Sequence, residues 1–402
     1  MSGPLEGVRI VDLTAVLMGP YATQILGDYG AEVIKIEAPD GDVMRGVGPM
    51  RNPQMGPIFL NTNRNKRSIV LDLKQPAARE AVLRLARNAD VFVYNVRPQA
   101  MERLGLGYAA VAAVNPSIVY AALVGFGSAG PYAGRPAYDD LIQGMAGIPA
   151  LMGMAQGEPR YAPFAAADRT VGLAAANAIL AALFARERSG RGQAIEVPMF
   201  ETMIQYLYAD HLMGRTYEPP LGPAGYPRLV ALERKPYRTT DGHICILVYT
   251  DRQWQDFFEL AGRPELKTDA RFADMGSRTA NVSTLYALLA DILATRSTAE
   301  WMKSLVKADI PCAPLKSLDE VMDDEHLSAV GMFPVSEHPS EGLIRSIAPA
   351  ARFAGTPAGI ERHAPRFGEH TVEVLGEAGY DAAEIGALIA SGAAIAATEK
   401  AQ

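Results

Sequence analysis

One carboxylate, Asp168, stands where a side chain could act as a nucleophile. It follows three alanines and precedes a run of small and apolar residues, 174–185, which predicts a helix buried nearly all round. This position predicts that Asp168 is the helix N-cap, where free backbone N–H groups and the helix dipole favour the ionised form. An ionised carboxylate in an apolar setting can attack a carbonyl carbon. The alternative is that Asp168 does no more than cap the helix.

Basic side chains gather in the segments that flank predicted strands. Residues 61–67 contain Arg64, Lys66 and Arg67 just before one predicted strand, and Arg97 and Arg103 follow another. Open α/β sheets bind ligands at the ends of their strands, so these charges are candidates for contact with an anionic ligand. Each of them could equally be a solvated surface charge.

The segment Gly125–Pro131 matches the pattern GxGxxG of dinucleotide-binding proteins. That fingerprint needs its third glycine inside a helix that packs on the preceding strand. Here Pro131 follows the third glycine, and Gly134 and Pro136 come soon after, so no helix starts in register. We interpret the segment as a loop and not as a nicotinamide dinucleotide site.

Length and composition limit the classes of function. The chain has 402 residues, too many for one ordinary core, and its net charge of −7 argues against general nucleic-acid binding. Its two cysteines, Cys245 and Cys312, predict neither a disulfide framework nor a metal cluster, and the six histidines are scattered without a ligand motif. We expect no metal.

The chain shows no targeting pattern that we recognise. Its first residues lack a basic segment followed by an apolar one, which predicts that there is no signal peptide. The apolar run 171–185 is short for a membrane span. We therefore expect a cytoplasmic protein without a membrane partner.

Strands and helices alternate in the first half of the chain. Predicted strands cover 8–13, 32–37, 68–73, 90–95, 117–124 and 194–197, and predicted helices cover 21–29, 76–87, 138–146, 168–186 and 200–213. Residues 153–160 read as a polar turn. Strands that alternate with helices indicate a parallel α/β layer.

The composition changes near Gly222, where several prolines fall close together. After them, Asp241-Gly242 between two β-rich runs predicts a hairpin. Predicted helices at 251–261, 277–294 and 298–307 and a strand at 310–315 complete a smaller α+β domain over 226–325. Short strands over 336–354 and helices at 368–378 and 382–391 follow.

Several blocks of sequence, in this order, resemble the class III CoA-transferases, which include formyl-CoA transferase, carnitine CoA-transferase and the α-methylacyl-CoA racemases. The resemblance covers essentially the whole chain. It is carried by Leu5–Thr14, Gly19-Pro20, Asp28–Glu37, Asn63–Ile69, Leu71–Lys74, Leu104–Gly107, Tyr138-Asp139, the Asp168 helix, Gly190–Gln193 and Phe367–Thr371.

The resemblance implies a fold. It implies a large Rossmann-like α/β domain with a parallel sheet, built from both ends of the chain, here 1–222 and 330–402. It also implies a smaller domain from the middle of the chain and two subunits interlaced like links, a homodimer.

The resemblance also implies an activity and a site. Asp168 is then the nucleophile that moves CoA between two carboxylic acids, through an aspartyl anhydride and an aspartyl-CoA thioester. Coenzyme A and acyl-CoA are substrates, and no permanently bound cofactor is implied. The residues expected to bind CoA are Val16, Leu17, Leu71, Lys74, Arg97, Arg103, Tyr138 and Asp139.

Two other functions stay open at this point. The racemase branch uses a histidine directly before an aspartate, and Tyr138-Asp139 stands there in this chain. A tyrosine has a pKa near 10 and is a poor proton shuttle at neutral pH, so transfer is favoured over racemisation or epimerisation of an acyl-CoA. A non-catalytic CoA-binding protein is the other alternative, and it requires that Asp168 be a cap and nothing more.

Overall fold

The structure is a computed structural model that describes residues 3–397, and these residues form two units. Unit 1 comprises the described residues up to 142, residues 164–204 and the chain from 325 onward. Unit 2 comprises 143–163 and 205–324. These units do not coincide with the domains predicted over 1–222, 226–325 and 330–402, and those boundaries stay a prediction. Residues 143–163 and 205–222 belong to unit 2, because the helix in the first of these segments packs against the start of the predicted small domain.

Unit 1 is built on a seven-stranded sheet with the order β12-β3-β2-β1-β4-β5-β6. The first six strands along the chain are parallel, and β12 pairs with β3 in the antiparallel sense. This confirms the predicted parallel α/β sheet. The strands are β1 (Arg9–Leu13), β2 (Glu32–Glu37), β3 (Lys66–Leu71), β4 (Val91–Tyr94), β5 (Val119–Val124), β6 (Gln193–Pro198) and β12 (Ala394–Ile395).

The chain runs from β1 outward through β2 to β3 and then returns to β4 on the other side of β1. The connection that follows β1 therefore runs toward one edge of the sheet, and the connection that follows β4 runs toward the other edge. A crevice forms at the carboxyl ends of the strands at such a switch point, and open α/β sheets bind their ligands there.

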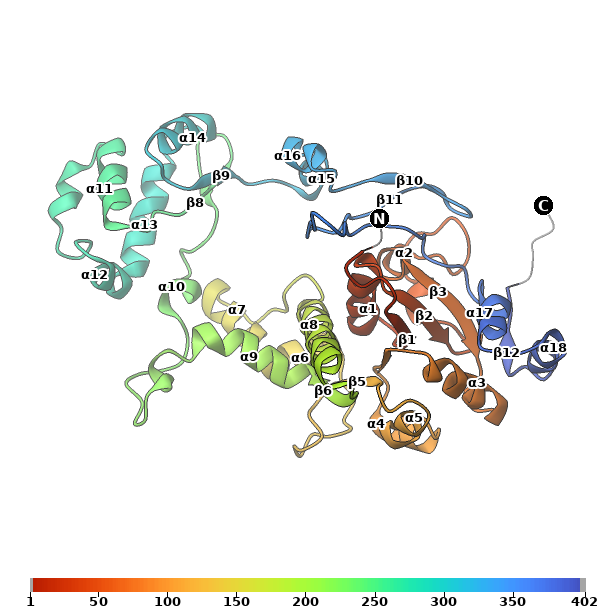
Figure 1. The fold of residues 1–402 in the computed structure, drawn as a ribbon. Helices are drawn as coiled ribbons and strands as arrows, with labels where there is room; N and C mark the ends of the chain where they lie inside the picture. The colour runs from red at the N-terminus through yellow and green to blue at the C-terminus, as the bar shows by residue number, and fades with distance from the viewer. Residues whose placement is uncertain (1–2, 398–402) are drawn as a thin grey trace. The chain divides into compact units, whose positions relative to one another are not determined.

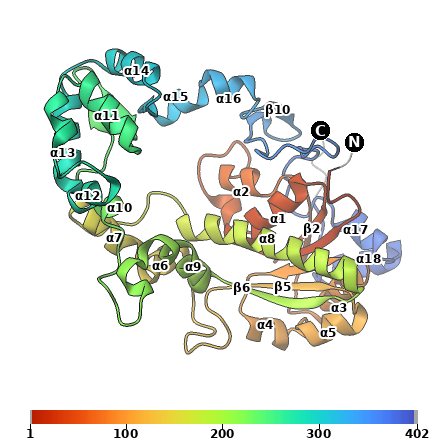
Figure 2. The ribbon, with the colours of Figure 1, turned by 60° about the vertical axis from the view of Figure 1, so that its left-hand side comes forward.

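Helices cover both faces of this sheet (Figures 1 and 2). α3, α5, α17 and α18 share one apolar cluster with the strands, and α1 packs with α8 on the opposite face. The helices of unit 1, with the short helices η1 and α2, are α1 (Met18–Asp28), η1 (Val43–Gly46), α2 (Pro57–Thr62), α3 (Pro76–Arg87), α4 (Pro98–Arg103), α5 (Tyr108–Val114), α8 (Ala166–Ser189), α16 (Glu325–Ala329), α17 (Thr371–Glu377) and α18 (Ala382–Ala390).

The long helix α8 lies close to α1 at a glycine. A Cβ atom on Gly172 would lie 2.8 Å from the backbone oxygen of Met18, so only glycine fits between the two helices. The composition of α8 predicted a helix that is buried nearly all round, and this prediction was wrong. Leu173 and Phe184 are 54% and 62% exposed, because residues 3–397 leave this side of α8 uncovered.

Unit 1 also contains a two-stranded antiparallel ribbon, β10 (Val335–His338) and β11 (Gly342–Arg345). Two further helices, α6 (Asp139–Ala146) and α9 (Met199–His211), start in unit 1 and end in unit 2.

Unit 2 has a three-stranded antiparallel sheet, and the predicted Asp241-Gly242 hairpin joins its first two strands. Its core is aromatic, with Trp254, Phe257, Phe258 and Trp301 in mutual contact. The elements are α7 (Ile148–Gln156), η2 (Met213–Thr216), α10 (Pro227–Val230), β7 (Tyr237–Arg238), β8 (His243–Ile246), α11 (Asp251–Leu260), η3 (Pro264–Thr268), α12 (Met275–Ala280), α13 (Val282–Leu293), α14 (Thr298–Lys307), β9 (Cys312–Pro314) and α15 (Leu318–Met322).

Two local predictions in this region were wrong. The helix predicted over 277–294 is two helices that break at Asn281, whose side-chain amide donates to the backbone oxygen of Ser277. Half of the polar turn predicted at 153–160 lies in helix α7, which ends at Gly157 in the left-handed conformation.

Candidate active site

A pocket of about 480 Å³ opens at the switch point of the sheet in unit 1. Its walls come from the loops that follow β1, β4 and β5, from residues 133–138, and from the first turn of α8. All of these segments belong to unit 1. The pocket therefore lies where the topology alone places a ligand site.

The loop after β1 is held in a strained conformation on the wall of this pocket. Val16 has a φ of 71°, a left-handed value that a β-branched residue adopts only under constraint. The side chain of Asn95, which follows β4, bonds both backbone groups of Ala15, at 3.0 Å to the N–H and 2.7 Å to the oxygen. The carboxylate of Asp42 accepts from the Val16 N–H at 3.2 Å.

Buried charges anchor the same loop from beneath. Lys35 Nζ lies 2.8 Å from the Thr14 oxygen and 2.9 Å from Asp42 Oδ2. Asp12 accepts from Thr14 and, at 3.2 Å, from Lys66 Nζ. Lys35, Lys66 and Asp12 have no exposed surface. Ions buried this deeply need partners, and here the partners are the groups that shape the loop.

Burial shifts the pKa values in this network. Burial lowers the pKa of Lys66 to about 8, against the attraction of Asp12. Burial opposes the charge on Asp12 as well, but Lys66 and Lys35 outweigh it and lower the pKa of that carboxyl.

The basic side chains of 61–67 are therefore paired with carboxylates of the protein, which fits neither of the two alternatives, a ligand contact or a solvated surface charge. Lys66 lies inside β3, where it holds Asp12. Arg64 forms two bonds with Asp28, at 2.9 and 2.6 Å, and Arg67 pairs with Glu373 and Glu377. Their carboxylate partners lie far away in the sequence, so the sequence showed the charges without the pairs.

Asp168 lines the pocket, but it is not the helix N-cap. α8 begins at Ala166 with Ala165 at the N-cap position, so Asp168 is the third residue of the first turn. Its backbone N–H donates to Asp139 Oδ2 at 2.9 Å, so the carboxylate that bonds a free N–H of this helix belongs to Asp139. The three alanines before Asp168 misled the prediction, because two of them already lie in the helix.

The pKa of Asp168 is raised to about 6. Burial is the largest cause, the carboxylate of Asp139 is the next, and Arg169 opposes both. The helix end was expected to stabilise the charged form of Asp168, but the pKa shifts the other way because burial and Asp139 disfavour the charge. At pH 7 the group is still mostly ionised, and its charge is less stabilised than that of a carboxylate in water.

The structure brings some of the predicted CoA residues to this pocket and not others. Val16, Arg97 and Tyr138 line it together with Asp168, and Asp139 contacts Asp168. The remaining four do not line the pocket: Leu17 lies at the N-cap of α1, the fully buried Leu71 at the end of β3, Lys74 just beyond it, and Arg103 in the last turn of α4.

Arg135 and Asn95 line the pocket and were missed. The guanidinium carbon of Arg135 lies 4.4 Å from the centre of the Tyr132 ring. The sequence of this loop indicates a turn and gives no sign of a ligand site. Asn95 follows β4 directly, and its position after a strand was the signal that could have identified it.

The GxGxxG segment is a loop, as predicted. The N–H groups of Gly127 and Ser128 donate to Glu201 and Glu196, each at 2.9 Å. These donors are therefore occupied by carboxylates of the protein itself, which would also repel a phosphate.

Comparison with known proteins identifies the family to which this chain belongs. The sequence model described as CoA-transferase family III matches residues 5–371. The chain belongs to CoA-transferase family III. It is an enzyme that transfers CoA, and its substrates are CoA thioesters and carboxylic acids.

Named relatives of this family III enzyme match over nearly its whole length. An acyl-CoA transferase of Fusarium pseudograminearum is 36% identical over 95% of this chain and 86% of its own. A succinyl-CoA:glutarate CoA-transferase of Mus musculus is 34% identical over 97% and 90%. A crystal structure of a Mycobacterium tuberculosis protein, orthorhombic form, superposes with a TM-score of 0.81 at 34% identity, covering 92% of this chain and 99% of that one.

Among the described residues, one helix of this family III enzyme, α8, is long and apolar enough to cross a membrane. It packs against α1, β5 and β6. A core helix of a soluble protein passes the same test, so α8 is weak evidence for a membrane span.

Proposed function

We propose that Asp168 is the nucleophile of a CoA-transferase that works through covalent aspartyl intermediates. The observation that carries the proposal is the position of Asp168, an ionisable and partly buried carboxylate on the wall of the pocket at the switch point. Carboxylate nucleophiles split a difficult transfer into easier steps.

The first half of the reaction loads CoA onto the protein. The Asp168 carboxylate attacks the thioester carbonyl of the donor, and the CoA thiolate leaves, so that a mixed anhydride forms. The thiolate then attacks the aspartyl carbonyl, and the donor acid departs as a carboxylate. Asp168 is now a CoA thioester, and the departing acid carries one oxygen that belonged to Asp168.

The second half is the reverse with another acid. The acceptor carboxylate attacks the aspartyl-CoA thioester and releases the thiolate, which forms an anhydride again. The thiolate attacks the acceptor's carbonyl, and Asp168 leaves as a carboxylate. No net proton transfer and no oxidation occur, and water must be kept out because it would hydrolyse both intermediates.

The electrostatics of the site support this role. A carboxylate whose pKa is raised to about 6 is more basic than an ordinary aspartate and is still largely ionised at pH 7. The N–H groups of Ala166 and Ala167 occupy the first two positions of α8, where helices leave donors free. We assign to them the stabilisation of the oxyanions that form at the attacked carbonyls.

Coenzyme A is proposed to lie along the carboxyl edge of the sheet. Val16, Arg97 and Tyr138 are the contacts within the pocket, with Asp139 beside Asp168. Leu17, Lys74 and Arg103 are proposed to contact the parts of coenzyme A that extend beyond the pocket, whereas Leu71 has no exposed surface with which to contact it.

The acids are proposed to be short dicarboxylic acids. Relatives are named for glutarate, mesaconate and oxalate. Racemisation gains no support, because none of the described residues that line the pocket is a histidine and Tyr138 is a poor proton shuttle.

We further propose that the enzyme is an interlaced homodimer in the cytoplasm. The support for a second subunit is the uncovered apolar side of α8, with Leu173 and Phe184 more than half exposed. Apolar faces of this kind mark interaction surfaces.

The test of the proposal is Asp168→Ala in an assay that follows CoA exchange between two acids. Loss of a nucleophile is expected to lower kcat by a factor on the order of 10⁴ or more. Asp140→Ala is the matched control, because this exposed carboxylate does not line the pocket, and it should keep full activity. Full exchange activity in Asp168→Ala would show that the mechanism is wrong.

A further inference from the structure

Unit 2 carries a second cavity, about 380 Å³ in volume, whose lining residues all belong to that unit. Its walls are α10, the segment that leads into β7, the strand β8 with the residues after it, and one side of α13. The volume lies within the range of small-molecule sites, about 300–1,000 Å³.

The cavity is cationic. Arg228, Arg234 and Lys235 line it, and no carboxylate does among the described residues. None of the three forms an ion pair within residues 3–397, and the neighbouring Glu233 is not part of the lining. Like charges that share one cavity repel each other, so an anion that entered would relieve this repulsion.

Arg228 lies among tyrosine side chains that favour its charged form. Its Nε donates to the hydroxyl of Tyr226 at 3.4 Å, and its guanidinium lies near the ring of Tyr249. Burial opposes the charge, but hydrogen bonds to Tyr226 and Tyr286 outweigh it and raise the pKa of Arg228.

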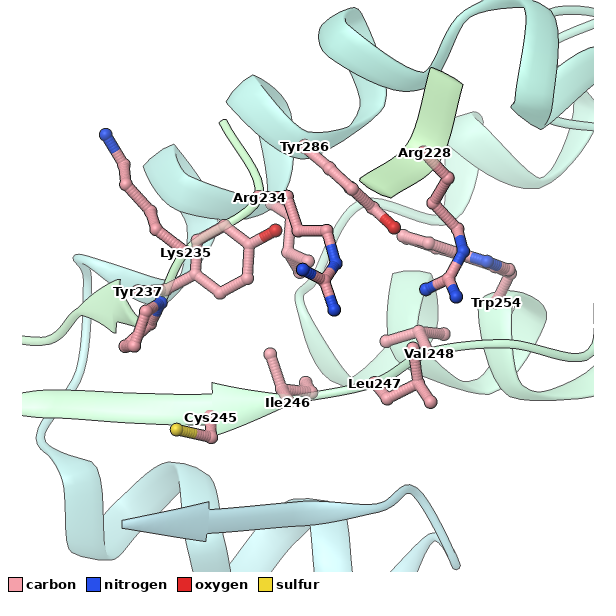
Figure 3. A pocket seen from close by; sticks show the side chains of 12 residues that line it. Arg228, Arg234, Lys235, Tyr237, Cys245, Ile246, Leu247, Val248, Trp254 and Tyr286 are labelled. Atoms are coloured by element: carbon pink, nitrogen blue, oxygen red, sulfur yellow. The ribbon is translucent and has the colours of Figure 1, made fainter. Parts of the chain in front are cut away.

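The two guanidinium groups point into the same space. Figure 3 shows Arg228 and Arg234 directed toward the strand that carries Ile246, whereas the ammonium group of Lys235 points away from it. Guanidinium groups match the planar fork of a carboxylate and bind it through paired hydrogen bonds.

The rest of the wall is apolar. Ile246, Val248, Trp254 and Leu289 line the cavity, and the last three are at most 6% exposed. A site with two convergent arginines and a hydrocarbon surface fits an anion that has a short carbon chain, and it fits a bare inorganic ion poorly.

We propose that this cavity binds a small organic acid, with a carboxylate between Arg228 and Arg234 and its carbon chain against Ile246, Val248 and Leu289. The proposal rests on the proposed function only for the choice of acid, a short dicarboxylate. The binding itself needs neither CoA nor Asp168.

The test is a titration of the full-length protein with glutarate, without CoA, followed by tryptophan fluorescence. The chain has two tryptophans. Trp254 lines the cavity, and Trp301 is buried in the core with no exposed surface, so a saturable change reports on the cavity. Glutaramide, which has the same carbon chain without charge, and inorganic phosphate are the control ligands.

Three arginine variants make the test specific. Arg228→Gln and Arg234→Gln should each weaken glutarate binding by about tenfold or more, since each removes charged hydrogen bonds. Arg238→Gln is the matched control, because Arg238 is exposed on β7 and does not line the cavity, and its affinity should stay within about twofold. Circular dichroism checks that each variant is folded.

The possible results separate this proposal from the proposed function. Saturable glutarate binding that Asp168→Ala keeps and Arg234→Gln loses supports the site, whether or not the protein transfers CoA. Binding that Asp168→Ala loses and Arg234→Gln keeps would place the acid in the other pocket and overturn the proposal. Glutaramide or phosphate binding as tightly as glutarate, an equal loss in Arg238→Gln, or no saturable change would overturn it as well.

Discussion

Asp168 is partly buried next to a second carboxylate, and both facts raise its pKa to about 6. Below this pH the group is protonated and cannot attack a thioester. In the free enzyme the relevant rate constant is kcat/KM, which reports the ionisation of the unliganded site. We therefore expect kcat/KM to fall about tenfold for each pH unit below about 6 and to be level above about 7.

The charge of Asp139 supplies part of this shift, so Asp139→Asn should move the midpoint. Asparagine can still accept the hydrogen bond from the Asp168 N–H, but it no longer repels the nucleophile's charge. The acid limb of kcat/KM should move to lower pH by about 0.5–1 unit. A pH–rate profile measures this, with Asp140→Asn as the control that should leave the midpoint in place. A midpoint that rose in Asp139→Asn would contradict the assignment.

At the residue scale, the sequence pointed to Asp168, which lines the pocket, but it predicted the surroundings of this residue wrongly. Asp168 was found from its three preceding alanines and the apolar run after it, and these local features are real. Its N-cap position was wrong by three residues, and its pKa moved in the direction opposite to that expected from the helix end. The N-cap position was wrong because two of the three alanines already lie in the helix, and the pKa was wrong mainly because Asp168 is partly buried. Asp139, which bonds the helix start and adds to the shift, is 29 residues away, and single-sequence patterns do not reveal such contacts.

The element that shapes the pocket is the loop after β1. Its strained residue, Val16, is held by Asp42, which in turn pairs with Lys35 at 2.9 Å, and both partners of this pair are buried. A loop that keeps a valine at positive φ needs such support, because the conformation alone costs about 1–3 kcal/mol.

Lys35→Met should therefore destabilise the protein and loosen the pocket. Removal of one partner from a buried pair leaves an uncompensated charge, and we expect a loss of about 3–5 kcal/mol in the free energy of unfolding. Arg9→Met is the control, because the Arg9–Glu32 pair is about one-third exposed, and it should cost less than about 1 kcal/mol. Chemical denaturation gives both values. Equal losses in the two variants would refute the structural role given to the buried pair.

A second change offers a check on the same element. In Lys35→Met combined with Asp42→Asn, the unpaired charge is gone while an acceptor for the Val16 N–H remains. Part of the lost stability should return, and KM for the acyl-CoA should move back toward the value of the parent enzyme. No recovery would show that Lys35 acts through something other than Asp42.

Elements were predictable where their signals are local. Strands β4 and β5 are apolar runs buried on both faces, and α14 and the β7–β8 hairpin carry their own cap and turn signals. α7 was missed because Gly153 and Gly157 suggested a turn, although the first lies inside the helix. The sequence also showed Lys66 and Arg67 without their partners, so charges that lie within the sheet were assigned to a ligand.

On the scale of the whole molecule, the order of the strands decides where the pocket lies. A pattern of alternating strands and helices predicts a parallel sheet and does not specify that β1 adjoins β4. That adjacency, which creates the switch point, depends on pairings between residues about 80 apart, such as Val11 with Phe92. The resemblance to a family implied a Rossmann-like parallel sheet and stated no strand order, and the structure supplies that order.

The uncovered side of α8 leads to a prediction about assembly. Phe184 is 62% exposed on this helix, and a charge at this position should oppose any partner that covers it. We expect Phe184→Asp to shift the protein from dimer to monomer in sedimentation velocity at micromolar concentration. Ile389→Asp on α18, 38% exposed, is the control and should remain dimeric. A parent protein that sediments as a monomer would contradict the proposed dimer.

The most direct test of the central claim follows an oxygen atom. In the proposed sequence, the acceptor acid leaves one of its carboxylate oxygens on Asp168 in each turnover. Turnover with an acceptor acid labelled with oxygen-18 should therefore place heavy oxygen in the proteolytic peptide that contains Asp168, and fragmentation should locate it on that side chain. The Asp140 side chain in the same digest should stay unlabelled. CoA exchange that proceeds at full rate while Asp168 gains no label would contradict the account.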